Sequence, residues 1–170
     1  MKISVIIPAY NEEGNIEELF EKIDEGLSQF PSMEKEVCFI DDGSKDNTYK
    51  IAEELQKTKY QYIRLIKHRK NKGLSEALMS GFRNVTGDII VYLCSDLQSN
   101  PLEDIPLLVN KILEGYDVVA GWRQGRRDRK NFVSKIYNKL SMKLFNISIH
   151  DNNWVKAFRK EVIKKIHLRK

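Results

Sequence analysis

The 170-residue sequence contains only two cysteines and no long apolar run. No stretch approaches the roughly 20 apolar residues that a membrane-spanning helix needs, and no secretory signal opens the chain. Cys38 and Cys94 both lie in apolar, strand-like runs, so we expect two buried, reduced thiols in a cytosolic protein. The length suffices for one domain with a sizeable core, and residues 1–170 are predicted to form a single domain.

Two common nucleotide-binding motifs are also missing. GxGxxG does not follow the first apolar run, and GxxxxGK[ST] does not occur, which argues against a Rossmann dinucleotide site and a P-loop. The three histidines, His68, His150 and His167, are scattered and have no metal-ligand spacing. The sequence supports no Ser/His/Asp arrangement either.

Acidic residues outnumber basic ones in the first 119 residues and are scarce afterwards. Residues 1–119 carry 14 Lys/Arg and 21 Asp/Glu, a net charge of −7, whereas residues 120–170 carry 15 Lys/Arg and three acids, a net charge of +12. The basic part predicts an anionic partner, either a phosphate, a membrane surface or a nucleic acid. We predict no nucleic-acid partner, because that part has no recognisable RNA or DNA motif and the acidic part would repel a nucleic acid backbone.

Short apolar runs alternate with helical patterns over the first two-thirds of the chain. The expected strands are 3–8, 36–41, 62–66, 88–93 and 116–121, and the expected helices are 12–28, 45–57, 73–85 and 104–114. This alternation predicts an α/β fold with βαβ units and a mainly parallel sheet flanked by helices. Asn11 and Ser44 are candidate caps of the first two helices, and Pro106 fits the first turn of the fourth. Beyond Gly121 follow a basic loop, an amphipathic segment at 131–146, a short strand near 154–158 and a last helix.

Polar residues gather where the predicted strands end. Open parallel sheets bind ligands beyond the carboxyl ends of their strands. The first strand ends in PAYNEEGN, the second in DDGSKDNT, the fourth in CSDLQSNP and the fifth in GWRQGRR. One aspartate could cap a turn, but the pair Asp41 and Asp42 suits recognition of a base N–H and ribose hydroxyls. Tyr10 could stack on a flat ring or simply pack.

Taken together, these motifs resemble the family 2 glycosyltransferases with the GT-A fold. More narrowly, they resemble the branch of dolichyl-phosphate mannosyltransferases and other polyprenyl-phosphate sugar transferases. SVIIPAYNEEGNI, FIDDGSKDNT, NKGLSEALMSGFRNVTGDIIVYL and SDLQSNP occur in the order and spacing of the family, and DNNWVKAFRKEV resembles the segment after its catalytic strand. The resemblance extends from Lys2 to about Ile166. It implies transfer of a sugar from a nucleotide diphosphate sugar, GDP-mannose or a UDP-sugar, to an acceptor.

The resemblance also implies a role for each matching position. The nucleotide would be held by Pro8, Tyr10, Asn11, Glu12 and Asp41, with Asp42 assisting. Asp96, helped by Gln98, would bind the Mg²⁺ or Mn²⁺ on the diphosphate, and Arg123 would lie near an acceptor phosphate, with Arg126 and Arg127 as helpers. In this scheme the catalytic residues are Asp96 and Arg123, residues 1–119 bind the nucleotide sugar, and residues 120–170 face the acceptor.

The chemistry of the basic loop favours a lipid phosphate as the acceptor. A hydroxyl acceptor needs a carboxylate base within reach, whereas a phosphate arrives ionised. Segment 121–131 offers four arginines and one acid, and arginine forks bind phosphate oxygens with paired hydrogen bonds. Segment 131–146 either covers the sheet or lies on anionic lipid. We therefore expect a peripheral protein at the cytoplasmic face of a membrane, with membrane contact through 123–146.

Two departures from the family pattern leave alternatives open. Cys94 stands where the family has the first acid of Asp-x-Asp, and a soft thiol is a poor ligand for Mg²⁺ or Mn²⁺, so weakened metal binding is expected. The chain also stops soon after FRKEV, where relatives continue into further helices, so a missing C-terminal tail or a membrane partner is expected. The alternatives are a zinc-preferring site, transfer to a sugar hydroxyl, and a weakly active or non-catalytic nucleotide-sugar-binding module.

Overall fold

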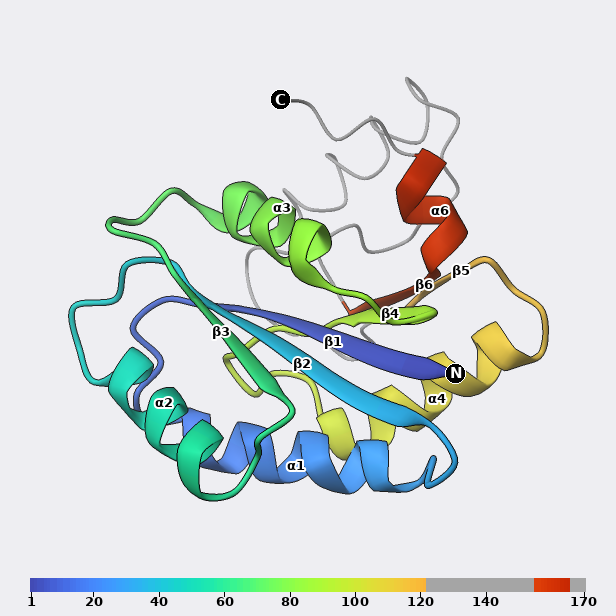
Figure 1. Cartoon of the computed structure of the whole chain (residues 1–170), viewed down its shortest axis with the longest axis horizontal. Helices are drawn as coiled ribbons and strands as arrows, with labels where there is room; N and C mark the ends of the chain where they lie inside the picture. The colour runs from blue at the N-terminus through green and yellow to red at the C-terminus, as the bar shows by residue number, and fades with distance from the viewer. Residues whose placement is uncertain (122–154, 166–170) are drawn as a thin grey trace, which may run out of the picture.

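A six-stranded sheet with helices on both faces forms the centre of the molecule (Figure 1). The computed structural model describes residues 1–121 and 155–165. The strands are β1 (Lys2–Ala9), β2 (Glu34–Asp41), β3 (Ile63–Lys67), β4 (Ile89–Tyr92), β5 (Val118–Ala120) and β6 (Lys156–Arg159). The helices are α1 (Ile16–Ser28), α2 (Thr48–Thr58), α3 (Leu74–Asn84), α4 (Pro101–Leu113) and α6 (Lys160–Lys165). All five strands expected in the first two-thirds are therefore confirmed, as are the short strand and helix near the C-terminus.

The strand order is β3-β2-β1-β4-β6-β5. The first four strands are parallel to one another, and β6 is antiparallel to both of its neighbours. The predicted α/β class and mainly parallel sheet are thus confirmed. β6 comes from the C-terminal part of the chain yet lies between β4 and β5, so the two predicted parts, 1–119 and 120–170, contribute to the same sheet. The functional division between these parts stays a prediction.

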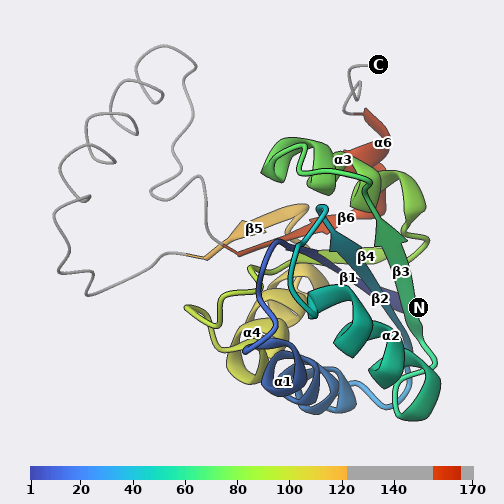
Figure 2. The same ribbon diagram turned by 90° about the vertical axis from the view of Figure 1, so that its left-hand side faces the viewer.

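Two apolar layers cover the faces of the sheet. Helices α1, α2 and α4 lie on one face, and α3 and α6 lie on the other, as both views show (Figures 1 and 2). The apolar residues of α1 recur at helical spacing, and the buried ones are Ile16, Leu19, Phe20, Ile23 and Leu27. They pack on Val5, Ile7, Val37 and Phe39 of the sheet. On the other face, Ile6, Cys38, Ile40 and Ile90 pack on α3 and α6. Residues of β1 and β2 thus alternate between two cores, as expected for strands buried on both faces.

The helix ends differ from the prediction. Helices α1 and α2 begin later than expected, with Asn15 and Asn47 as the preceding residues, so neither Asn11 nor Ser44 caps a helix. The side chains of Asn11 and Ser44 instead bond across the loops that follow β1 and β2. Such cross-loop bonds compete with capping and are invisible in local sequence.

The fourth helix also begins earlier than predicted. Pro101 occupies its first turn, where a missing N–H costs nothing, and Pro106 lies inside the helix instead of in its first turn. Because Pro106 has no N–H to offer, the carbonyl of Leu102 lacks its usual partner one turn earlier. Gln29 Nε2 donates to that carbonyl over 3.3 Å, which offsets part of the loss.

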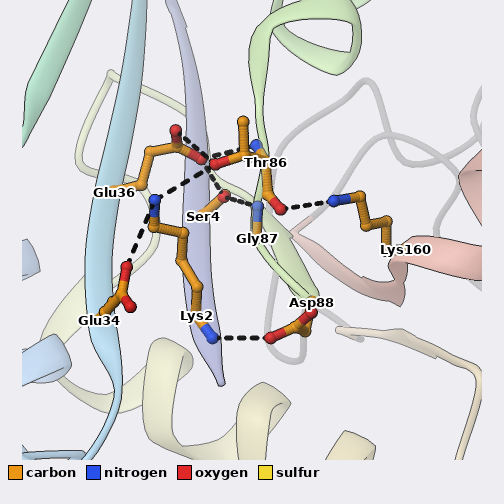
Figure 3. Close-up of polar contacts among 8 residues, drawn as sticks. All are labelled: Lys2, Ser4, Glu34, Glu36, Thr86, Gly87, Asp88 and Lys160. Carbon is orange, nitrogen blue, oxygen red and sulfur yellow. Dashed lines mark hydrogen bonds and ion pairs between the residues drawn. The ribbon is translucent and has the colours of Figure 1, made fainter.

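A polar network closes the amino end of the sheet (Figure 3). Ser4 Oγ donates to the Glu36 carboxylate and accepts from Gly87 N at 2.8 Å. Glu36 also accepts from Thr86 N at 2.8 Å and from Thr86 Oγ1 at 3.0 Å. Lys160 Nζ donates to the Thr86 carbonyl at 2.6 Å, which ties α6 to the turn before β4. Burial opposes ionisation of Glu36, but the hydrogen bonds outweigh it and hold its pKa below the ordinary value.

Candidate functional site

The loops that follow the parallel strands meet at one edge of the sheet. Ala9 at the end of β1 pairs in register with Asp41 at the end of β2, and Asp41 pairs with Lys67 at the end of β3. The loops after these three strands lie together on the left of Figure 1. In an open α/β sheet this carboxyl edge is where a ligand site is expected.

The first two loops are joined by hydrogen bonds. Asn11 N donates to Ser44 Oγ at 3.0 Å, and Lys45 N donates to Asn11 Oδ1 at 2.9 Å. Glu12 N donates to Thr48 Oγ1 at 2.8 Å. Asn11 has a φ of 56°, a left-handed conformation that is uncommon for a residue with a side chain. The structure therefore places the predicted nucleotide residues Asn11 and Glu12 at a fixed junction between the loops.

A cavity of about 130 Å³ opens between the ends of β1 and β2 and the start of α3. Its lining residues are Pro8, Ala9, Tyr10, Asp42, Asn71, Gly73, Leu74 and Ala77. Three of the predicted nucleotide residues, Pro8, Tyr10 and Asp42, thus share one cavity. Tyr10 is 40 % exposed, so its ring is available to a ligand. A mostly apolar cavity with a few fixed polar groups suits a flat heterocycle.

The two adjacent aspartates have different surroundings. Asp42 lines the cavity and is buried, and its carboxylate accepts from His68 Nδ1 at 2.6 Å, Gly73 N at 2.8 Å and Lys72 N at 3.0 Å. Asp41 is fully buried outside the cavity lining, where its Oδ1 accepts from Ser44 N at 3.2 Å. Asp41 Oδ2 has no hydrogen-bond partner among the described residues.

Sequence reasoning missed the contribution of the loop before α3. His68, Asn71 and Gly73 all contact Asp42 or the cavity. Gly73 has a φ of 88°, and Gly43 has a φ of 76° with the backbone of Lys70 lying where a Cβ would be. These positions favour glycine and fix the loops that they join. The NKG stretch after the third strand was the one available signal.

The loop after β4 holds the predicted metal residues. Asp96 is exposed, and its Oδ1 accepts from Gln98 N at 3.2 Å. Leu97 between them has a φ of 52°, a strained conformation for a leucine. Cys94 is half-buried, unlike the fully buried Cys38, so the expectation of two buried thiols holds for Cys38 alone. Cys94 Sγ lies 3.5 Å from the Tyr92 hydroxyl.

The loop after β4 offers the right kind of ligands for a hard cation, but too few of them to form a complete metal site. Asp96 and Gln98 offer a carboxylate and an amide oxygen, the ligand types that Mg²⁺ and Mn²⁺ prefer. Within residues 1–121 and 155–165, no group of three or more His, Cys, Asp or Glu side chains could hold a metal by itself. The chain would therefore supply one or two ligands, and a bound diphosphate would have to supply others.

A second polar cluster follows the same loop. Ser99 Oγ, Asn100 Oδ1 and Asp104 Oδ2 are buried and have no hydrogen-bond partner within the described part of the chain. Burial raises the pKa of the Asp104 carboxyl above its ordinary value and outweighs the opposing hydrogen bond from the Asn100 backbone, and the charge of Glu103 adds to the rise. The predicted acceptor residues Arg123, Arg126 and Arg127 lie outside the described residues, as does segment 131–146. Where the chain is described, no helix is long and apolar enough to cross a membrane.

The sequence is similar to those of known proteins over almost its whole length. Residues 4–166 match the family model described as Glycosyl transferase family 2. The chain is 36 % identical to undecaprenyl-phosphate 4-deoxy-4-formamido-L-arabinose transferase of Klebsiella pneumoniae (strain 342), over 95 % of this chain and 50 % of that protein. It is 37 % identical to dolichol-phosphate mannosyltransferase of Pyrococcus furiosus, over 99 % of this chain and 49 % of that protein. The chain thus spans about half the length of the curated relatives it matches.

Solved structures show the same architecture. Glucosyl-3-phosphoglycerate synthase from Mycobacterium tuberculosis, in complex with Mn²⁺, UDP-glucose and phosphoglyceric acid, matches with a TM-score of 0.72 and 25 % identity, over 95 % of this chain and 57 % of that one. A mannosyltransferase from Pyrobaculum calidifontis, in complex with GDP-Man and Mn²⁺, matches with a TM-score of 0.72 and 20 % identity, over 98 % of this chain and 46 % of that one. The match to the Pyrobaculum calidifontis mannosyltransferase shows a shared fold.

Proposed function

The chain belongs to glycosyl transferase family 2 and has the GT-A fold, and from this premise we propose that it transfers a sugar from a nucleotide diphosphate sugar to a polyprenyl phosphate. The observation that carries the proposal is the pairing, on one sheet edge, of a cavity for a flat ring with an exposed carboxylate loop. Both curated relatives named above are transferases named for a polyprenyl phosphate.

The nucleoside would occupy the cavity beside β1. Tyr10 offers an exposed ring for stacking, Pro8 forms an apolar wall, and Asp42 offers a fixed acceptor for a base N–H. Asp41 Oδ2, which has no partner among the described residues, would bind the nucleotide as predicted if it becomes accessible when ligand binds. Asn11 and Glu12 would act by holding the loops in register.

The diphosphate would lie toward the loop after β4. Asp96, with Gln98, would hold a divalent cation there, and such a cation supplies charge stabilisation for a leaving nucleotide diphosphate. Cys94 contributes a soft sulfur where a carboxylate oxygen would bind Mg²⁺ or Mn²⁺ more tightly. We therefore expect metal binding that is weak until the nucleotide supplies phosphate oxygens.

The acceptor proposal rests on charge. A phosphate acceptor is ionised and needs no general base, whereas a sugar hydroxyl does. The arginines Arg123, Arg126 and Arg127 would pair with the acceptor phosphate, which keeps this anion beside the donor sugar. Membrane contact through 123–146 and a place at the cytoplasmic face of a membrane belong to the same proposal, because a polyprenyl phosphate resides in a bilayer.

A thermal-shift panel tests the donor site. UDP, GDP, UDP-glucose and GDP-mannose are each added with Mg²⁺, with Mn²⁺ or with EDTA, to the wild type and to Cys94→Asp. We expect one nucleotide series to raise the Tm in a metal-dependent way, and a larger metal-dependent rise in Cys94→Asp because a second carboxylate completes the site. No response from either protein to any nucleotide would remove the nucleotide-sugar proposal.

A transfer assay tests the acceptor. Radiolabelled donor is incubated with a short-chain polyprenyl phosphate or with a free sugar, and product is extracted into organic solvent or separated on anion exchange. Product on polyprenyl phosphate alone supports the proposal. Product on the free sugar alone supports transfer to a hydroxyl, and metal-independent binding without product supports a non-catalytic nucleotide-sugar-binding module.

A further inference from the structure

A chain of three polar side chains joins the end of β2 to the middle of α3. Asp42 Oδ1 lies 2.6 Å from His68 Nδ1, and His68 Nε2 lies 2.9 Å from Ser80 Oγ. The side chains of Asp42 and His68 are only 5 % and 6 % exposed. Because a carboxylate can only accept, His68 Nδ1 donates in the first bond, and Nε2 is the ring atom that meets the Ser80 hydroxyl.

The Asp42 carboxylate is held on several sides. Oδ1 accepts from His68 Nδ1 and Oδ2 accepts from Gly73 N at 2.8 Å, while Lys72 N is shared between Oδ1 at 3.0 Å and Oδ2 at 3.2 Å. Three donors thus meet a carboxylate that has about four acceptor positions, so one position remains for a further donor. Asp42 also lines the cavity beside Tyr10. The carboxylate is thus fixed in one orientation with an acceptor left for a ligand.

Asp42, His68 and Ser80 follow the carboxylate–imidazole–hydroxyl order of a catalytic triad. Their buried position instead indicates that they orient one another. Ser80 lies one turn beyond Ala77 and next to Gly81, and both of these residues are buried where α3 packs on the sheet. Its hydroxyl therefore points from the packing face of α3 toward a buried imidazole. Ser80 fixes His68, and His68 fixes Asp42.

We infer that His68 is a positioning residue that presents the Asp42 carboxylate to an N–H donor of the nucleobase, with Ser80 as its anchor. The inference rests on the proposed nucleotide site and deepens it. A preoriented acceptor loses little entropy on binding and discriminates in favour of a ring that offers an N–H there. The Asp96 loop follows a different strand, so the imidazole supports the nucleoside end of the donor and leaves the diphosphate end unchanged.

Two isosteric variants separate the two bonds of His68. In His68→Asn the amide nitrogen takes the place of Nδ1 and can still donate to Asp42, whereas the contact with Ser80 is lost. In His68→Gln the longer side chain places its amide near Nε2, so Ser80 keeps a partner and Asp42 loses one. If the Asp42 contact matters, His68→Gln weakens nucleotide binding about tenfold, the value of one charge-assisted hydrogen bond, and His68→Asn weakens it less.

Isothermal titration of UDP and GDP with Mn²⁺, at a temperature well below each Tm, measures this difference. Titration of inorganic pyrophosphate with Mn²⁺ gives the diphosphate contribution, which we expect to be equal in all variants. In the transfer assay His68→Gln should raise KM for the donor and leave kcat near the wild-type value, since the contact is made equally in the ground state and the transition state. Ser4→Ala, in the polar network at the opposite end of the sheet, is the matched control for lost stability.

The outcomes separate the two proposals. Equal nucleotide affinities for wild type and His68→Gln overturn the positioning role while the proposed function stands. A loss in Ser4→Ala as large as that in His68→Gln also overturns it, because general destabilisation would then explain both. If the wild type binds neither UDP nor GDP, the proposed function fails first.

Discussion

The two ends of the sheet differ in whether their buried polar groups have hydrogen-bond partners. At the amino end, Glu36, Ser4 and Thr86 bond to one another and to Gly87, and every one of these contacts is buried or half-buried (Figure 3). At the carboxyl end, four buried side-chain oxygens lack a hydrogen-bond partner within the described residues. They are Asp41 Oδ2, Ser99 Oγ, Asn100 Oδ1 and Asp104 Oδ2. Asp41 is the last residue of β2, and the other three follow the end of β4.

Backbone strain has the same distribution. In the described part of the chain, Asn11 and Leu97 are the residues other than glycine with a positive φ, and they follow the ends of β1 and β4. Unpaired buried oxygens and left-handed side-chain residues both cost stability, and they persist where the surrounding structure holds them for a ligand. The amino end thus stabilises the fold, while the carboxyl end carries the unpaired acceptors and strained loops that the proposed ligand site would use.

The largest expected effect comes from Asp96 at the carboxyl end. Asp96→Asn keeps an oxygen for Gln98 N but removes the charge that would hold a divalent cation. We expect sugar transfer to fall about a hundredfold or more, and the free energy of unfolding to change by less than about 0.5 kcal/mol because the side chain is exposed. The transfer assay and urea unfolding, run on the same preparations, measure the two effects. A large loss of stability would assign Asp96 to the scaffold.

Substitution of Glu36 at the amino end should lower stability and leave nucleotide binding unchanged. Glu36→Leu leaves Ser4 Oγ, Thr86 N and Thr86 Oγ1 without their acceptor in a buried setting. We expect the free energy of unfolding to fall by about 3 kcal/mol, since several donors lose their partner at once. Nucleotide affinity, measured by titration below the lowered Tm, should stay at the wild-type value. A changed affinity with unchanged stability would contradict the division of roles between the two ends.

The sequence alone predicted more of the scaffold than of the site. Apolar runs located every strand of the parallel part, and the runs of β1, β2 and β4 are continuous in sequence because these strands are buried on both faces. Adjacent strand residues point to opposite faces, so Asp41 and Asp42 had to differ. Asp42 shares a face with Ile40 and α3, where the cavity lies, and Asp41 shares a face with Phe39. No local pattern tells which face carries the cavity.

His68 was beyond sequence reasoning for a similar reason. A single histidine has no spacing to read, and its two partners are 26 and 12 residues away in the chain. The predicted starts of the first two helices were wrong because Asn11 and Ser44 bond to each other's loops instead of capping a helix. The His68 contacts and the bonds between the two loops join segments that are distant in sequence, so only the folded structure reveals them.

The smallest expected effect compares one carboxyl from each end, Glu36 and Asp104. Hydrogen bonds hold the pKa of Glu36 below its ordinary value of 4.5 despite its burial, so ionised Glu36 favours the folded state. That stability is fully present above about pH 4.5 and is lost as the pH falls through the folded pKa. Burial raises the pKa of Asp104 above 3.8, so its ionisation opposes folding. Its penalty is absent at low pH and grows as the pH rises through the folded pKa.

The matched amide variants should therefore change stability with opposite signs at neutral pH. Glu36→Gln loses stability because one acceptor oxygen becomes a donor that faces other donors. Asp104→Asn gains less than about 1 kcal/mol, because its amide can donate to the unpaired oxygens of Ser99 or Asn100 and no charge remains to be buried. Urea unfolding from pH 7 to pH 3 measures both: the Asp104→Asn difference should shrink as the pH falls toward 3.8, and the Glu36→Gln difference only once the pH falls below 4.5. If Asp104→Asn is destabilising at pH 7, the Asp104 carboxylate is satisfied in the folded protein and the contrast between the two ends is weaker than the unpaired oxygens indicate.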